Sequence, residues 1–338
     1  MNSAPARGAA AAPAAGDTCL LINPLATRTL YGSLAARARA MAEMVGIEVA
    51  LVSDPRQITS LLQRLHARRV KQLFVLSGDG TAQIIAAYLE QLPPGEWTPN
   101  LLLLGGGRAN VVPRAHGGDP ALPALRAALD AMREGRALRV ESQPLLRIEQ
   151  EGRPAPHGFV VAGAIIDFGI RRCQEYRASG TSRWHRGLAA DRWCVFKLLL
   201  QAAIGRSPAP PSPQLDITLD SGERMLSRVR VLMATSLRDA DGHYNPYAER
   251  GSGPLRVTAV ASDARRFWRN LPRALAGRFD DNMTTLQGYL SGRCHSIEIR
   301  GLGGCSLDGV PVETDPALPV RVTSGMSLNI LQPFAAGA

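Results

Sequence analysis

The chain has 338 residues, 45% hydrophobic and 20% charged, a balance that is typical of globular proteins and allows two domains. Its formal net charge of +10 comes mostly from dispersed arginines, which favours anionic partners such as phosphorylated ligands and membrane surfaces. No basic block, zinc-finger spacing or aromatic-basic RNA motif occurs, so no nucleic-acid partner is expected.

The N-terminus and the cysteines indicate a cytoplasmic protein. Residues 1–16 are rich in Ala, Pro and Gly without a continuous apolar stretch, which predicts a disordered tail rather than a signal peptide. No apolar run reaches the roughly 18 residues of a membrane-spanning helix, so any membrane association should be peripheral. The cysteines are odd in number and form no CxxC pair, so we expect reduced, mostly buried thiols at Cys19, Cys173, Cys194, Cys294 and Cys305.

From about residue 17, short apolar runs alternate with helical patterns. Such runs are typical of buried parallel strands, and their alternation with helices predicts a parallel sheet that is covered on both faces. The expected strands are 19–23, 47–52, 72–77 and 101–105, and the expected helices are 29–45, 55–69, 81–92 and 120–134.

After residue 134 the pattern changes to short strands with polar turns, which predicts an antiparallel sandwich or barrel. A helical patch at 184–204 and a Pro-rich linker at 207–214 interrupt the strands. The expected strands are 143–150, 158–164, 214–220, 228–235, 254–261, 295–300, 319–324 and 326–332.

Three polar turns follow strands of the first half. They are Asn23-Pro24, residues 77–81 with the sequence SGDGT, and residues 105–110 with the sequence GGGRAN. Open α/β sheets bind ligands at the carboxyl edge, where these turns should meet. Glycines allow the backbone to approach a ligand closely, and the N–H groups at a helix start suit a phosphate. Asp79 would repel that phosphate unless a cation lay between them.

The order of these turns resembles the catalytic family of diacylglycerol kinases and sphingosine kinases. The family's NPxxG-type turn is matched by Asn23-Pro24, its GGDGT by residues 77–81, and its P-x-G-T-x-N turn by residues 105–110, followed by Arg114. In the second half, residues 242–260 are similar to a glycine-proline loop of the family, and Asp308-Gly309 stands where the family has D-G-E. The resemblance extends from Leu20 to Pro333.

The resemblance implies a fold of two domains with a cleft between them. A doubly wound α/β nucleotide-binding domain would span residues 17–140. A β-rich lipid-binding domain would span residues 141–338, with the option that the last strand returns to the first domain.

The resemblance also implies ATP-dependent phosphorylation of a lipid hydroxyl with Mg²⁺, in which positioning and charge neutralisation dominate. Asp308 would take the proton from the hydroxyl. Asp79 would contact the metal rather than the phosphate. The implied nucleotide-binding residues are Asn23, Ser77, Gly78, Asp79, Gly80, Thr81, Gly107, Arg108 and Asn110.

Three positions depart from the family pattern. Ser77 replaces a small Gly, whereas Arg108 replaces a Thr of the third turn with a long cation that either binds phosphate or fills the nucleotide pocket. Val310 replaces the Glu of D-G-E, and the next acid is Glu313. These departures leave open a nucleotide- or lipid-binding member with weakened chemistry. A kinase of the NAD kinase type shares the GGDG turn and also remains open.

Structural readings stand beside the functional ones. Asp79 could cap the following helix, Asn23-Pro24 is an ordinary turn dipeptide, and Asp308-Gly309 is a common hairpin turn. Asn110 and Arg114 could cap and solvate the following loop. Asp167 is a lone carboxylate among apolar residues. It fits a buried or turn acid that is satisfied by hydrogen bonds as well as it fits a functional site.

Residues 264–279 suggest a membrane partner. They place an apolar helical face beside several arginines and a Trp, as in segments that bind anionic membrane surfaces, although Pro272 could break the helix. The lipid substrate that the resemblance implies must be collected from somewhere, so we expect peripheral contact with an anionic membrane surface, while a homodimer remains open.

Overall fold

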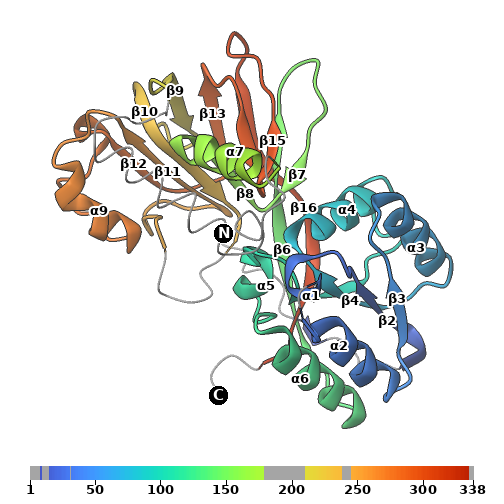
Figure 1. The fold of residues 1–338 in the computed structure, drawn as a ribbon. Coiled ribbons are helices and arrows are strands. Elements are labelled where there is room, and N and C mark those ends of the chain that lie inside the picture. Colours follow the sequence, from blue (N-terminus) through green and yellow to red (C-terminus); the bar gives the residue numbers. More distant parts are fainter. Residues whose placement is uncertain (1–7, 10–14, 31, 179–209, 238–244, 335–338) are drawn as a thin grey trace. The chain divides into compact units, whose positions relative to one another are not determined.

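The computed structural model describes residues 8–9, 15–30, 32–178, 210–237 and 245–334 (Figure 1). The helical patch expected at 184–204 lies outside the described residues, as do most of the expected tail and the start of the linker. The chain forms two compact units. Unit 1 comprises Met1–Pro144, Arg238–Asp241 and Met326–Ala338, and unit 2 comprises Leu145–Leu237 and Gly242–Gly325.

Unit 1 contains the predicted parallel sheet. Its order is β3-β2-β4-β5, with the end of β16 parallel to β5. Every residue of β2 and β4 is buried, which explains why these strands appear as continuous apolar runs. The strands are β2 (Thr18–Ile22), β3 (Glu48–Leu51), β4 (Gln72–Ser77), β5 (Asn100–Gly105) and β16 (Val320–Gln332).

Helices cover both faces of this sheet, so the predicted doubly wound arrangement is confirmed. In Figure 1, α2 and α6 lie on one face and α3 and α4 on the other. Asp54 starts α3 by accepting the Arg56 N–H, and Pro55 follows in the first turn. The helices are α1 (Thr27–Leu30), α2 (Leu34–Glu43), α3 (Pro55–Ala67), α4 (Asp79–Glu90), α5 (Val111–Ala115) and α6 (Ala121–Arg133).

Unit 2 is an antiparallel sandwich, as predicted. The long strand β10 joins its two sheets: Arg224–Arg228 pair with β9, whereas the rest pairs with β8 and β11. The register shifts between Val229 and Val231, a bulge that bends the strand from one sheet to the other. The strands are β7 (His157–Gly158), β8 (Val160–Ala164), β9 (Gln214–Leu219), β10 (Arg224–Thr235), β11 (Leu255–Ala261), β12 (Tyr289–Cys294), β13 (Ser296–Arg300), β14 (Cys305–Leu307) and β15 (Val310–Val312), with β6 (Arg139–Glu149) and β16 crossing the unit boundary.

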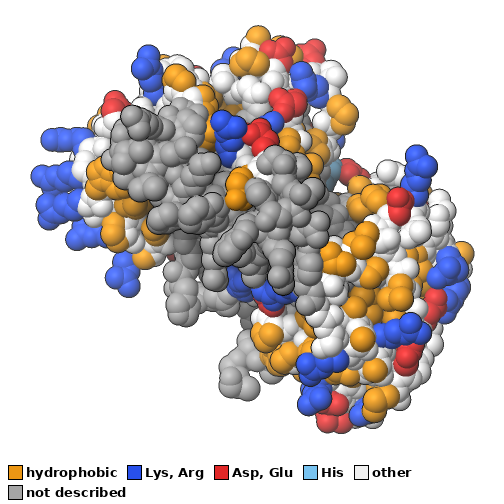
Figure 2. Space-filling view, in the orientation of Figure 1, with side chains coloured by type: hydrophobic (Ala, Val, Ile, Leu, Met, Phe, Trp, Pro, Cys, Tyr) orange, Lys and Arg blue, Asp and Glu red, His pale blue; other side chains and the backbone are white. Residues whose placement is uncertain are grey.

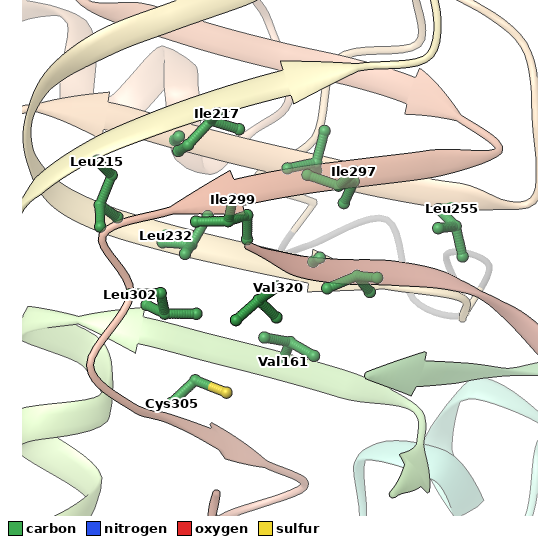
Figure 3. Close-up of a cluster of buried hydrophobic side chains, with 14 of the residues drawn as sticks. Val161, Leu215, Ile217, Leu232, Leu255, Ile297, Ile299, Leu302, Cys305 and Val320 are labelled. Atoms are coloured by element: carbon green, nitrogen blue, oxygen red, sulfur yellow. The ribbon is translucent and has the colours of Figure 1, made fainter. Parts of the chain in front are cut away.

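The core of unit 2 lies between the two sheets. Figure 3 shows Ile217 and Ile297 of one sheet with Val161 and Cys305 of the other. We expect Ile217→Ala, in this fully buried position, to lower the free energy of unfolding by about 2–5 kcal/mol. Leu226→Ala, at a side chain that is 62% exposed on β10, should change it by less than about 0.5 kcal/mol. Urea denaturation of both variants tests this difference, and equal effects would contradict the assigned core.

Several elements differ from the expectation. The expected helix 29–45 is two helices, because Gly32 and Ser33, which favour helix ends, lie between them. The two strands expected at 319–324 and 326–332 form one strand, β16 (Val320–Gln332), and α9 (Phe267–Leu275) continues through Pro272. Within the expected tail, β1 (Gly8–Ala9) pairs with β6 and η1 (Ala15–Asp17) is a 3-10 helix. The structure adds α7 (Ile165–Ala178), β12, the β14-β15 hairpin and η3 (Thr285–Gln287).

The described cysteines agree with buried thiols. Cys19, Cys294 and Cys305 are buried, Cys173 is half-buried, and none of these four forms a disulfide. Burial raises the pKa of Cys19, Cys294 and Cys305 to about 12, so these thiols stay protonated at neutral pH. No helix in the described part of the chain has the length and apolar character needed to cross a membrane.

Candidate functional site

The three turns of unit 1 meet at the carboxyl edge of the sheet. The Asn23 N–H donates to the Leu76 carbonyl at 3.0 Å, and the Gly106 N–H donates to the Ser77 carbonyl at 2.9 Å. The Arg28 N–H in turn donates to the Gly106 carbonyl at 2.9 Å. Main-chain hydrogen bonds therefore bring the predicted residues of all three turns together.

Glycines make this approach possible. A Cβ on Gly107 would lie 2.5 Å from the Gly78 Cα, and a Cβ on Gly106 would lie 3.0 Å from the Ser77 nitrogen. The first distance is shorter than real side chains show and the second is tighter than most, so Gly107 above all must be glycine for the second and third turns to pack on each other. A Cβ on Gly80 would meet nothing within 4 Å, so the backbone is accessible there.

The two predicted asparagines brace their own turns. Asn110 is fully buried in the left-handed region (φ 47°), and its Oδ1 accepts the Gly107 N–H at 2.8 Å. Asn23 Oδ1 accepts the Leu25 N–H at 2.9 Å, while the Asn23 carbonyl accepts the Thr29 hydroxyl at 2.6 Å. Asn tolerates such local bonding and backbone conformations well. Their contact with a nucleotide stays a prediction.

Asp79 faces the start of α5. Its Oδ1 accepts the Val112 N–H at 3.4 Å. Burial raises the pKa of Asp79 above its ordinary value, although N–H groups of Val112, Val111 and Asn110 act in the opposite direction. Asp79 thus links α4 to α5. The capping interpretation of Asp79 is wrong, because α4 begins at Asp79 itself and its N-cap is Gly78, with no side-chain cap hydrogen bond.

No part of the described chain gathers three or more His, Cys, Asp or Glu side chains that could hold a metal ion. The geometry around Asp79 therefore gives no support to a metal site built from protein ligands alone. The metal role of Asp79 stays a prediction.

Two of the residues that depart from the family pattern, Ser77 and Arg108, lie in unit 1. The Ser77 hydroxyl lies 2.5 Å from the Thr81 hydroxyl, and both side chains are buried. Arg108 is half-buried, and its Nε donates to Oγ1 of Thr27, the first residue of α1, at 3.1 Å. Ser77 therefore stabilises the start of α4, whereas Arg108 connects the third turn to α1.

Asp119 is the important residue that sequence reasoning missed. Its side chain is only 8% exposed, and its carboxylate lies 2.7 Å from Arg28 Nη1, 3.6 Å from Arg114 Nη2 and 3.5 Å from Asn110 Nδ2. It joins α1, which follows the first turn, to the third turn and α5. The available signal was electrostatic, because arginines in the two helices that follow converging turns, Arg28 of α1 and Arg114 of α5, need a nearby counter-charge.

We expect Asp119→Asn to lower the free energy of unfolding by about 1–2 kcal/mol, because it removes the charge that binds Arg28 while keeping the side-chain size. The matched control is Asp17→Asn, whose pair with Lys71 is exposed and should contribute little. Urea denaturation compares the two variants, and an equal, small loss would show that Asp119 does not stabilise the turns.

Asp308 lies in unit 2, in the two-residue turn between β14 and β15. Asp308 and Gly309 both have positive φ, 49° and 83°, as the tight hairpin turn requires. The Asp308 carboxylate accepts the N–H of Phe159 at 3.0 Å and of Val160 at 2.7 Å. The backbone of Asp308-Gly309 therefore forms the hairpin turn that the sequence allowed. The Asp308 side chain is held against the start of β8.

The acids near this turn have other contacts. Val310, where the family has Glu, is 50% exposed. Glu313 binds Arg171 at 2.6 Å, and the same guanidinium binds Asp167 at 2.9 Å. Asp167 also accepts the Ser306 hydroxyl, which favours the satisfied-acid reading of Asp167.

The arrangement in unit 1 defines a class: an α/β protein whose glycine turns meet at the ligand-binding edge of a parallel sheet. Residues 17–143 match the family described as the diacylglycerol kinase catalytic domain. This match confirms the resemblance seen in the motifs of that segment. The match ends before unit 2 begins.

Similar solved structures include three from Bacillus anthracis str. Sterne, described as diacylglycerol kinases, two of them provisionally. Their TM-scores are 0.61, 0.56 and 0.57 at 17%, 16% and 17% identity, and each match covers 93% of this chain and 96% of the other. At such identity the likeness shows the fold. The search of curated proteins gave no match.

Proposed function

We propose that the protein transfers the γ-phosphoryl group of ATP to the hydroxyl of a lipid. One observation carries the proposal. In the segment that matches the diacylglycerol kinase catalytic domain, main-chain hydrogen bonds hold the Asn-Pro turn and the two glycine turns together at one edge of the sheet. The family implies the use of ATP. The lipid acceptor rests on the wider resemblance.

The start of α4 suits a phosphate. Gly78 is its N-cap and offers no side chain to the first-turn N–H groups, and Asp79 is directed toward Val112 of α5. A helix N-terminus with free backbone access attracts anions. Gly80, which has open space at its Cβ position, provides that access.

Mg²⁺ would accompany ATP and neutralise charge on the transferred group. Such ions take many of their ligands from substrate phosphates and water rather than from a protein cage. Because the described residues form no carboxylate cluster, no step of this proposal depends on a protein-bound metal.

Asp308 is the proposed general base. As the lipid oxygen bonds to the γ-phosphorus, its proton passes to the Asp308 carboxylate, and the bond to the bridging oxygen breaks to release ADP. The N–H groups of Phe159 and Val160 fix the orientation of this carboxylate, and carboxylate oxygens have further lone pairs for a hydroxyl.

A second candidate is a family member that binds nucleotide or lipid but has weakened chemistry. The observation in its favour is Arg108, which stands where the family has a small Thr. Its long side chain extends from the third turn to Thr27 of α1. Val310, which is exposed and stands where the family has an acid, also favours weakened chemistry.

A panel of acceptors tests these candidates. Purified protein is incubated with ATP, Mg²⁺ and diacylglycerols, monoacylglycerols, sphingoid bases or ceramide-like lipids in micelles, with NAD as a soluble acceptor. We expect a phosphorylated lipid and no reaction with NAD. Phosphorylation of NAD alone would establish the NAD kinase type, and ATP binding without any product would favour the weakened member.

A further inference from the structure

The surface around α9 in unit 2 combines positive charge with exposed apolar side chains. Residues 264–279 contain five arginines and no acidic residue. At the left of Figure 2, where Figure 1 places α9, Lys and Arg side chains gather beside hydrophobic ones. All five arginines are exposed: Arg265, Arg266, Arg269, Arg273 and Arg278.

One face of α9 is fixed to unit 2. Asn270 and Ala274 are buried, and Phe267 packs with a cluster that includes Tyr289. The Tyr289 hydroxyl donates to the Arg265 carbonyl at 2.8 Å, which holds the start of the helix. Residues that are three, four or seven positions apart share a helix face. The buried face is therefore set by Phe267, Asn270 and Ala274, and it leaves the other faces of α9 outward.

A second stripe of α9 is apolar and exposed. Trp268 is 78% exposed, and Leu275, seven residues later and thus on the same stripe, is 40% exposed. Arg269 and Arg273 form the next stripe, four residues apart. An amphipathic helix of this type, with Trp or Leu beside arginines, is suited to lie in a membrane interface.

A neighbouring segment adds another exposed apolar side chain. Leu286 of η3 is 96% exposed. The Arg265 N–H donates to the carbonyl of Gln287 at 3.0 Å, so η3 lies against the start of α9. Single exposed apolar residues are ordinary, but several beside a basic cluster mark an interaction surface.

We propose that this α9 surface, defined as Arg265, Arg266, Trp268, Arg269, Leu275 and Leu286, docks on an anionic phospholipid bilayer. The arginines would contact headgroup phosphates, while Trp268 and Leu286 enter the interface. Charge complementarity favours an anionic partner, and the protruding Trp and Leu side chains favour lipid over nucleic acid. The docking step goes beyond the proposed catalytic function and does not require it.

The test is co-sedimentation with phosphatidylcholine vesicles, with or without phosphatidylglycerol and without ATP. We expect binding that requires the anionic lipid and falls with salt. Changing Arg265, Arg266 and Arg269 together to Gln should weaken it about 100-fold, because each basic residue near such a surface contributes roughly fivefold. Trp268→Ala should weaken it about tenfold.

Two controls separate the surface from the overall charge. Changing Arg37, Arg133 and Arg136 of unit 1 together to Gln removes the same charge from other exposed positions and should leave binding within about twofold. Met44→Ala, at a side chain that is 76% exposed, should have no effect and controls for Trp268→Ala. Circular dichroism confirms that each variant is folded.

Equal binding to neutral vesicles would overturn the proposal, as would an equal loss in the triple variant of unit 1. The proposal would also be overturned if Trp268→Ala bound vesicles as well as the wild type and RNA displaced the vesicles. The surface would then bind polyanions in general. Vesicle binding without lipid phosphorylation would leave the docking surface intact and count only against the proposed catalytic function.

Discussion

Asp308→Asn should abolish lipid phosphorylation, with a loss of about 100- to 10,000-fold in turnover, the usual contribution of a positioned general base. Oδ1 of Asp308 accepts both the Phe159 and the Val160 N–H, so the amide oxygen of Asn can still accept both and the hairpin should keep its shape. It cannot accept the proton of the substrate. Initial rates at saturating ATP measure the effect.

The matched control is Asp216→Asn, which changes another carboxylate of unit 2. Asp216 is on β9 and binds the exposed Arg224 at 2.6 Å, so its loss should change the rate by less than about twofold. An Asp308→Asn protein that keeps more than about a tenth of the activity would show that Asp308 is a turn residue and not the base.

Gly107→Ala should remove nucleotide binding and lower the free energy of unfolding by about 1–3 kcal/mol. The added Cβ would lie 2.5 Å from the Cα of Gly78, and because that Cα is a main-chain atom it cannot move away as a flexible side chain could. The second and third turns must therefore separate. We expect ATP with Mg²⁺ to raise the melting temperature of the wild-type protein but not of this variant.

Gly16→Ala is the control for glycine loss itself, because its Cβ would meet nothing within 4 Å. Gly80→Ala is more informative. Its Cβ also meets nothing within 4 Å, so the free energy of unfolding should not fall. The same methyl group would obstruct a phosphate at the start of α4, so the ATP-dependent rise in melting temperature should be smaller. If Gly107→Ala kept the full ATP-dependent shift, the convergence of the turns would not form the nucleotide site.

The parallel half was predictable because its strands are buried on both faces and therefore continuously apolar, as in β2 and β4. The turns were predictable because glycine and Asn-Pro punctuate the chain after those strands. Their order also carried the family resemblance, which the match of residues 17–143 confirmed. What the turns bind remained a matter of resemblance.

The parts that escaped prediction depend on tertiary contacts. β12 is almost fully buried and contains Gly292 and polar residues, so it shows neither alternation nor an apolar run. Asp119 appears as a loop acid until folding brings Arg28 beside it across ninety-one positions. Leu286 is conspicuous only because η3 lies against α9.

The most direct test of the central claim compares γ-radiolabelled with α-radiolabelled ATP in the presence of diacylglycerol micelles and the other lipids of the panel. We predict organic-extractable label from the γ-labelled nucleotide alone, from wild-type protein and not from Asp308→Asn. No extractable label from any lipid, under conditions where ATP still raises the melting temperature, would contradict the assignment as a lipid kinase.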